Sequence, residues 1–220
     1  AARGQRHKYV PTDPTRRAAE QVVASTTPGP ITPSTPTTTN PVNVMSLRFG
    51  SLAPEAITAA SKLRKRGAEV VVAVVHAGGR CFAHANPNDL SSCDRDAGEI
   101  FELMDGIPAG TLDAVIAGHT HAVMGHFVNG TPIIESTGLG RGFGMIDLYV
   151  DQKTHKVRTN RTIISPQMAI CEKVEEGTLT CDSRKLRGRP GVKLVPAYFR
   201  GKPVVPDPVA AKIVSGFPGP

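Results

Sequence analysis

The sequence predicts an α/β fold, in which helices and buried strands alternate along the chain. Two segments with apolar residues at helical spacing are each followed by a short, continuous apolar run, which is typical of a strand buried on both faces. Alternating segments separated by turn residues follow, and these predict antiparallel strands. The 22 glycines and 19 prolines among 220 residues also predict many loops.

The first helix and strand are expected at residues 54–67 and 69–75. Pro54 suits the first turn of a helix, because the amide hydrogen that proline lacks has no helical partner there. Apolar residues then recur at helical spacing, and Gly67 is suited to end the helix. The valine-rich run that follows stops before His76, so this histidine is expected at the carboxyl end of a buried strand.

The same order repeats in the next segment. Asp96 is expected to cap a helix that extends through Met104, with Glu99 placed as in a capping box. Residues 112–117 form the second expected buried strand, and residues 118–121 (Gly-His-Thr-His) follow it directly. Two helix-then-strand units in succession predict strands whose carboxyl ends meet at one edge of the sheet.

The remaining part of the chain is predicted to be mostly strands and loops. Asn129 and Gly130 are a strong turn signal, because this pair favours the tight turn of a β-hairpin. A second turn is expected at residues 151–155, and the chain beyond Ser165 is expected to be rich in loops. The further expected elements are strands at residues 123–128, 132–136 and 143–150, a strand that ends at Ile164, and a helix at residues 207–215.

The formal net charge of +7 is unevenly distributed. Residues 184–202 hold basic and no acidic side chains, whereas acidic side chains dominate residues 81–121. The basic stretch is either a solvated arm or a surface that attracts phosphate groups. Nucleic acid is an unlikely partner on this pattern, because no aromatic platform or helical reading motif accompanies the charge. No membrane span is expected, because no apolar run is long enough to cross a bilayer.

The four cysteines stand as two close pairs, Cys81 with Cys93 and Cys171 with Cys181. Neither pair has the C-x₂-C spacing of a zinc ribbon. Two small loops, each closed by a disulfide, suit an oxidising compartment and hence a secreted or periplasmic protein. The alternative is four free thiols in a cytosolic protein, and the sequence leaves both open.

Three histidines, His76, His119 and His121, follow the two expected buried strands. Reactive residues gather outside the carboxyl ends of strands in open α/β sheets, and imidazole nitrogen suits zinc, manganese, iron, cobalt and nickel. The neighbouring glycines allow the backbone to approach metal ions closely. The alternative for any one of these histidines is a hydrogen-bonded, half-buried side chain.

Other polar residues near these motifs have weaker signals. Arg141, on a glycine-rich connection, is either a phosphate-binding residue or a solvated surface arginine. His84 and His126 are expected to have an ordinary polar role at the surface, with a place beside the metal ligands as the alternative.

Residues 70–78 and 117–121 together resemble the last two metal motifs of the calcineurin-like metallophosphoesterases, and within these the bacterial 5′-nucleotidase family. The resemblance extends from residue 25 to residue 215. It implies half of a four-layer α/β/β/α sandwich and a dinuclear site holding two divalent metal ions (Zn, Mn, Co or Fe). It also implies hydrolysis of nucleoside 5′-monophosphates or related phosphate esters. Further stretches that support the resemblance are residues 26–28, 35–41, 129–133 and 142–148.

In the roles that the resemblance implies, His76 and His119 ligate the second ion and His121 ligates the first. The family's earlier motifs, D-x-H, G-D and G-N-H-[DE], do not occur in this sequence. The bridging carboxylate and the phosphate-facing histidine are therefore missing, and the catalytic residues stay unassigned. These motifs belong to the first half of the family's catalytic domain. We expect the chain to be inactive without that half, and a complementary chain is one source of it. The alternative is a non-catalytic binding or scaffold fragment that keeps the fold.

The resemblance also divides the chain into three parts. Residues 1–24 are an N-terminal segment that the resemblance does not cover, so its origin is unassigned. Residues 25–206 correspond to the C-terminal half of a metallophosphoesterase domain. Residues 207–220 are expected to begin a linker helix toward an absent C-terminal domain.

Overall fold

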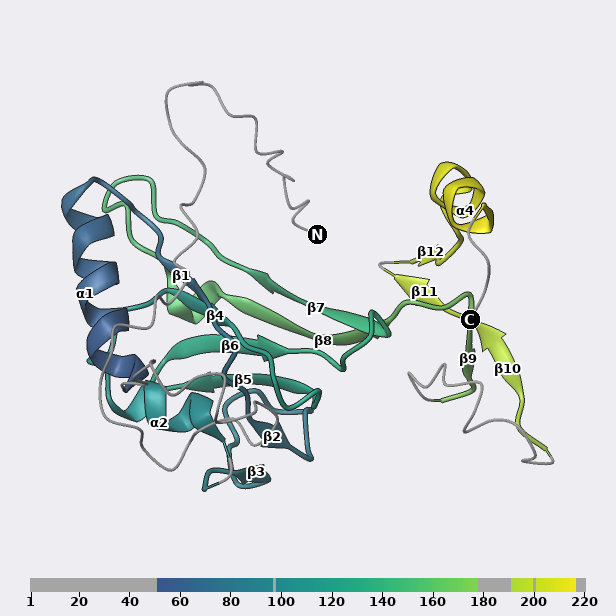
Figure 1. Cartoon of the computed structure of the whole chain (residues 1–220), viewed down its shortest axis with the longest axis horizontal. Helices are drawn as coiled ribbons and strands as arrows, with labels where there is room; N and C mark the ends of the chain where they lie inside the picture. The colour runs from purple at the N-terminus through teal and green to yellow at the C-terminus, as the bar shows by residue number, and fades with distance from the viewer. Residues whose placement is uncertain (1–50, 97, 178–190, 200, 217–220) are drawn as a thin grey trace, which may run out of the picture.

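The computed structural model describes residues 51–96, 98–177, 191–199 and 201–216 (Figure 1). The N-terminal segment 1–24 and the first part of the expected catalytic half therefore lie outside the described residues. The first helix, α1 (Leu52–Lys65), is confirmed. Gly67 follows it with a φ of +92°, a conformation that glycine adopts at little cost, so the chain turns sharply toward the first strand.

The central element is a four-stranded sheet in the order β1-β4-β6-β5. β1 and β4 are parallel, as are β4 and β6, whereas β5 and β6 form an antiparallel hairpin around Asn129 and Gly130. The predicted parallel pair and hairpin are confirmed, although the two buried strands are shorter than expected. The bounds of the four strands are β1 Val72–Val74, β4 Ala114–Ile116, β5 Met124–Val128 and β6 Thr131–Glu135.

Helices α1 and α2 (Glu99–Asp105) cover one face of this sheet, and a β-hairpin lies along β5 and β6 on the other (Figure 1). The alternation within β6 shows the two faces. Ile133 belongs to the core cluster shared with the helices, whereas Ile134 faces Gly144 of the hairpin. Side chains that are almost completely buried between helices and sheet include Ile100, Phe101, Val115 and Ile133. The α/β class is confirmed, and the four-layer sandwich stays a prediction.

The segment before α2 differs from the sequence-based expectation. Two short strands, β2 (Arg80–Cys81) and β3 (Cys93–Asp94), pair here, and α2 begins only at Glu99. The predicted cap by Asp96 is wrong, because Gly98 is the N-cap residue and no side chain caps the helix. A Cβ atom on Gly98 would lie 2.7 Å from the ring of Phe101, so glycine is the residue that fits at this N-cap position.

The hairpin of β7 (Gly142–Asp147) and β8 (Ile163–Ala169) follows β6. The predicted turn at residues 151–155 is confirmed, since Asp151 accepts hydrogen bonds from the amides of Lys153 and Thr154. The predicted strand ending at Ile164 is wrong. A 3₁₀ turn, η2 (Thr159–Arg161), lies where that strand was expected, and β8 begins only after the turn, at Ile163. Pairing with β8 then shifts register between Phe143, which pairs with Met168, and Met145, which pairs with Ser165.

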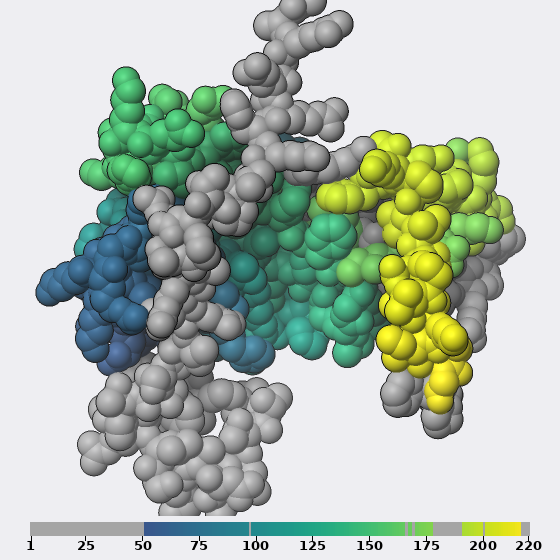
Figure 2. Space-filling model, turned by 90° about the horizontal axis from the view of Figure 1, so that it is seen from above, coloured from purple at the N-terminus to yellow at the C-terminus, as the bar shows by residue number. Residues whose placement is uncertain are grey.

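Beyond β8 the described chain forms two small ribbons and a helix. The predicted last helix is confirmed as α4, with the Asp207 carboxylate accepting from the amides of Val209 and Ala210. In both views these elements lie at the end of the molecule opposite α1 (Figures 1 and 2). The described helices include none long and apolar enough to cross a membrane. The bounds are β9 Lys173–Glu175, β10 Leu194–Pro196, β11 Tyr198–Phe199, β12 Lys202–Pro203 and α4 Pro208–Ser215.

Candidate metal centre

The carboxyl ends of β1 and β4 bring two histidines into contact. His76 follows β1, His119 follows β4, and the two strands are parallel neighbours. Nε2 of His76 and Nδ1 of His119 form a hydrogen bond at 3.0 Å, and the ring centroids are 4.8 Å apart in an edge-on arrangement. Both side chains are exposed, so a ligand in solvent can reach them.

The loop after β4 has an unusual backbone. His119 and His121 have φ angles of +95° and +52°, which residues with side chains seldom adopt. Such conformations cost free energy and persist only where neighbouring contacts enforce them. Gly78 supplies such a contact, because a Cβ atom there would lie 2.5 Å from the carbonyl oxygen of Gly118 and 2.8 Å from the methyl group of Thr120. The loops after β1 and β4 are thus packed backbone to backbone.

His121 packs against a third loop, the connection between β6 and β7. A Cβ atom on Gly138 would lie 2.7 Å from Cγ and Nδ1 of the His121 ring, so this ring occupies the space that the glycine leaves. Within the described residues, the direct ring contact joins His76 and His119 and does not include His121. Arg141 is exposed in the same connection, immediately before β7, and its predicted contact with phosphate stays a prediction.

The donor atoms at this edge fit a transition-metal ion. Zinc–nitrogen distances of about 2.0–2.1 Å place two neighbouring ligand nitrogens of one ion roughly 3–3.4 Å apart. The 3.0 Å separation of the His76 and His119 nitrogens lies in that range. Imidazole is a ligand for zinc, copper, iron and nickel, so the chemistry of the pair agrees with its geometry.

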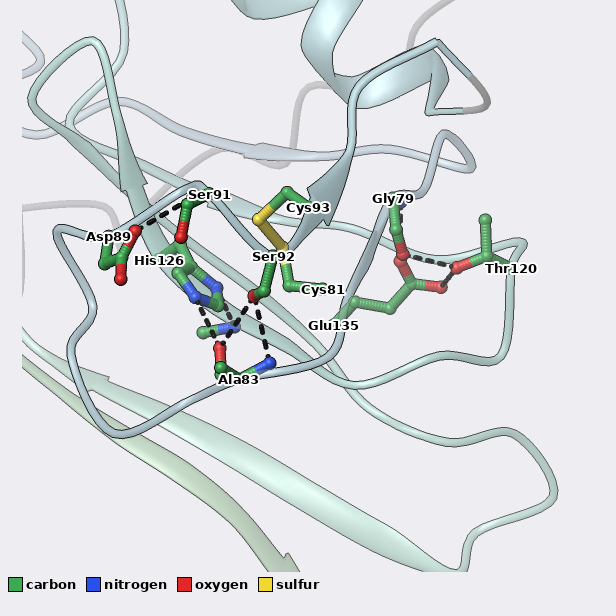
Figure 3. The surroundings of a disulfide bond; sticks show 11 residues. Gly79, Cys81, Ala83, Asp89, Ser91, Ser92, Cys93, Thr120, His126 and Glu135 are labelled. Carbon is green, nitrogen blue, oxygen red and sulfur yellow. Dashed lines mark hydrogen bonds between the residues drawn. A yellow bond between two sulfur atoms is a disulfide. The ribbon is translucent and has the colours of Figure 1, made fainter.

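Glu135, at the carboxyl end of β6, is a buried residue of this region that the sequence analysis missed. Its Oε2 accepts a hydrogen bond from the amide of Gly79 at 3.1 Å, and its Oε1 lies 2.8 Å from the hydroxyl of Thr120 (Figure 3). The residue is 3% exposed. A signal for it exists in the sequence, because Glu135 follows an apolar run just as His76 follows one.

Beside this edge, Cys81 and Cys93 are joined in a disulfide across β2 and β3 (Figure 3). This predicted pair is confirmed. The second predicted pair, Cys171 with Cys181, stays a prediction because Cys181 lies outside the described residues. The sulfur atoms of Cys81 and Cys93 and a ring nitrogen of His126 lie within 4.8 Å of one another. With the sulfurs bonded to each other, this group has no thiolate to offer a metal ion.

His126 is fully buried beneath the disulfide loop, so its expected surface role is wrong. Its Nε2–H donates to the carbonyl oxygen of Ala83 at 3.0 Å (Figure 3). Its Nδ1 accepts a hydrogen bond from the amide of Gly125 at 3.2 Å. Burial lowers the pKa of His126, and it also lowers the pKa of the neighbouring His84. The neutral imidazole of His126 therefore fastens the disulfide loop to β5.

Comparisons with known proteins show a distant relationship. No protein-family model matches the sequence. Among curated proteins, the chain is similar to Endonuclease YhcR of Bacillus subtilis (strain 168), with 25% identity over 129 residues. The match covers 59% of this chain and 10% of that relative, so the chain spans about a tenth of the relative's length.

Proposed function

We propose that this chain supplies the histidine ligands of a dinuclear metal site that hydrolyses phosphate esters. The observation that carries the proposal is the 3.0 Å contact between Nε2 of His76 and Nδ1 of His119 at the shared edge of two parallel strands. His76 and His119 are assigned to one ion and His121 to the other, the ions being Zn, Mn, Co or Fe. When bound, such ions neutralise phosphate charge and lower the pKa of a bound water.

The proposed substrate is a phosphate ester of a nucleotide, with nucleoside 5′-monophosphates as the first candidate. This choice follows the resemblance of the histidine motifs to those of bacterial 5′-nucleotidases. Phosphodiesters of nucleic acid are the second candidate, favoured by similarity to a relative named as an endonuclease. That similarity weighs against the sequence-based view that nucleic acid is an unlikely partner. Arg141 is proposed to contact phosphate in both cases.

We also propose that the chain acts with a complementary polypeptide that carries the carboxylate ligands. Three neutral imidazoles supply no negative charge to offset two divalent cations. Within the described residues β1 is an edge of the sheet, and Val74 and Ile116, which pair across β1 and β4, are 37% and 44% exposed. An open strand edge beside exposed apolar side chains suits the addition of further β-structure. This supports residues 25–206 as half of a larger sandwich.

The remaining assignments belong to the same proposal. α4, which lies within residues 207–220, is assigned to a linker helix toward a further domain. The Cys81–Cys93 disulfide supports an oxidising compartment, so we propose a secreted or periplasmic location.

Metal binding by the full chain tests the histidine assignment. Isothermal titration with Zn²⁺ is expected to show binding that His76→Ala or His119→Ala weakens at least about 10-fold, because each removes a ligand atom. His155→Ala is the matched control, since His155 is an exposed histidine paired with Glu69 at 2.9 Å. Equal binding by all four proteins would reject the assignment.

Phosphate release from nucleoside monophosphates, together with gel analysis of single-stranded DNA or RNA, tests the proposed activity and its substrate, because cleavage of an internal phosphodiester releases no free phosphate. The purified chain alone is expected to be inactive, and activity on nucleoside monophosphates should appear when a complementary first half is added with Zn²⁺, Mn²⁺ or Co²⁺. His119→Ala should abolish that activity. Hydrolysis of single-stranded DNA or RNA but not of monophosphates would select the second substrate. Metal binding without hydrolysis of either substrate by the assembly would favour the non-catalytic fragment.

A further inference from the structure

We propose that Glu135 is a positioning residue that fixes the two histidine loops and places a buried negative charge beside the metal ions. This inference rests on the proposed function, because it assigns Glu135 a role toward the same ions. It concerns a side chain that belongs to none of the motifs in which the histidines stand.

The position of Glu135 follows from the sheet topology. β4 is parallel to both β1 and β6, so the carboxyl ends of all three strands lie at one edge. His76 follows the first of these strands, His119 follows the second, and Glu135 ends the third. The carboxylate thus approaches the histidine loops from the next strand along.

The contacts of Glu135 join those two loops. Oε2 accepts from the amide of Gly79, in the loop after His76. Oε1 lies 2.8 Å from the hydroxyl of Thr120, the residue between His119 and His121. The same hydroxyl lies 2.9 Å from the carbonyl oxygen of Gly79, so Thr120 contacts both groups in one small network. Figure 3 shows Glu135, Gly79 and Thr120 grouped together, apart from the disulfide loop.

Close packing leaves Glu135 little freedom. A Cβ atom on Gly78 would lie 2.7 Å from Oε2 of Glu135, and the residue is 3% exposed. Among the described residues the ion pairs involve other carboxylates, and the partners of Glu135 are the amide of Gly79 and the hydroxyl of Thr120 rather than a lysine or arginine. A buried carboxylate without a cationic partner is costly. Divalent ions held by neutral imidazoles would offset that cost from the open side of the loops.

The test compares Zn²⁺ affinity of the full chain in two sets of variants. Glu135→Gln keeps the shape of the side chain and removes its charge, and it is expected to weaken Zn²⁺ binding about 10- to 100-fold. Glu102→Gln, on the exposed face of α2, is the matched control and is expected to bind as the wild type does. Thr120→Val removes the hydroxyl with little change of shape and is expected to weaken binding, whereas Thr120→Ser should bind nearly normally.

Urea unfolding of the metal-free proteins separates a purely structural role from positioning. A purely structural role would lower the stability of the metal-free Glu135→Gln protein and leave the Zn²⁺ affinity of its folded form unchanged. That result overturns the inference, as does wild-type affinity in Thr120→Val if Glu135→Gln does not fold. Failure of the wild-type protein itself to bind Zn²⁺ would instead reject the proposed function, and with it this role of Glu135.

Discussion

Arg64 of α1 and Asp113, the residue before β4, form a partly buried ion pair with Nη2 and Oδ2 2.5 Å apart. The same Oδ2 accepts a hydrogen bond from the amide of Val71 at 2.7 Å, and Nη1 of Arg64 donates to the carbonyl oxygen of Glu69 at 2.6 Å. The pair therefore fastens the end of the helix to the amino ends of β1 and β4. These are the ends opposite the histidines, so the pair supports the scaffold without reaching the candidate metal centre.

Asp113→Ala is expected to lower the free energy of unfolding by about 1–3 kcal/mol, because it leaves the Val71 amide without its acceptor and Nη2 of Arg64 without its carboxylate partner. Urea denaturation measures the change. Asp105→Ala is the matched control, since Arg95 and Asp105 form a pair with side chains 43% and 52% exposed. Exposed pairs contribute only about 0–1 kcal/mol. Equal destabilisation by both variants would contradict the prediction that the partly buried Asp113 stabilises the fold more than the exposed Asp105 does.

The sequence predicts those parts of the fold whose signals are local. The valine-rich run before His76 and the run before His119 predict buried strands because their residues are apolar without interruption. Asn129 and Gly130 predict the hairpin because their φ angles of +50° and +78° suit these two residue types. The contact between His76 and His119 then follows from two parallel strands ending at one edge.

Parts of the structure that depend on distant contacts could not be predicted in this way. The ring of Phe101 packs against Gly98, the N-cap residue of α2, and the local capping pattern at Asp96 gives no sign of that contact. The burial of His126 depends on the disulfide loop folding over β5. The apolar run before Glu135 indicates a strand but not its parallel pairing with β4, so the run alone does not place this carboxylate beside the histidine loops.

The Cys81–Cys93 disulfide is expected to stabilise the protein measurably. It closes a loop with a sequence separation of 12 residues, for which the chain-entropy model gives about 2–3 kcal/mol. The double variant Cys81→Ala/Cys93→Ala should lose that amount of unfolding free energy in urea denaturation.

Peptide mapping without reduction should recover Cys81 linked to Cys93 and, as predicted from the sequence, Cys171 linked to Cys181. Crossed pairs would contradict both assignments.

His126 is expected to make the protein less stable at mildly acidic pH. Its pKa in the folded protein is lowered by burial, whereas an unfolded histidine has a pKa of about 6.5. As the pH falls through about 6.5, His126 becomes protonated in the unfolded chain but stays neutral in the folded protein. Stability is therefore retained above that pH and decreases below it, by at most about 1.4 kcal/mol per pH unit for one group.

Urea denaturation between pH 7.5 and pH 5 measures this effect. His126→Gln should reduce the pH dependence, because glutamine can donate a hydrogen bond to Ala83 and does not titrate. His84, whose pKa is also lowered by burial, contributes in the same direction, so part of the slope should remain. Asp89 also faces His126, with a weaker and opposite effect on its pKa. An unchanged slope in His126→Gln would contradict this prediction.

Gly138→Ala is expected to impair metal binding while leaving the fold intact. The new Cβ atom would lie 2.7 Å from Cγ and Nδ1 of the His121 ring, which is too close, so the ring must move. His121 is exposed, so its side chain can rotate about the Cα–Cβ bond toward solvent, and the free energy of unfolding should fall by about 1 kcal/mol. The displaced ring would no longer be placed to ligate the ion that is assigned to His121. Titration with Zn²⁺ should therefore show weaker binding or fewer bound ions.

Gly144→Ala is the control, because its new Cβ atom would lie 3.4 Å from Ile134, an ordinary contact remote from the histidine rings. Zn²⁺ binding by Gly138→Ala equal to that of Gly144→Ala would show that the position of His121 does not matter for the metal, and would remove this histidine from the proposed ligands.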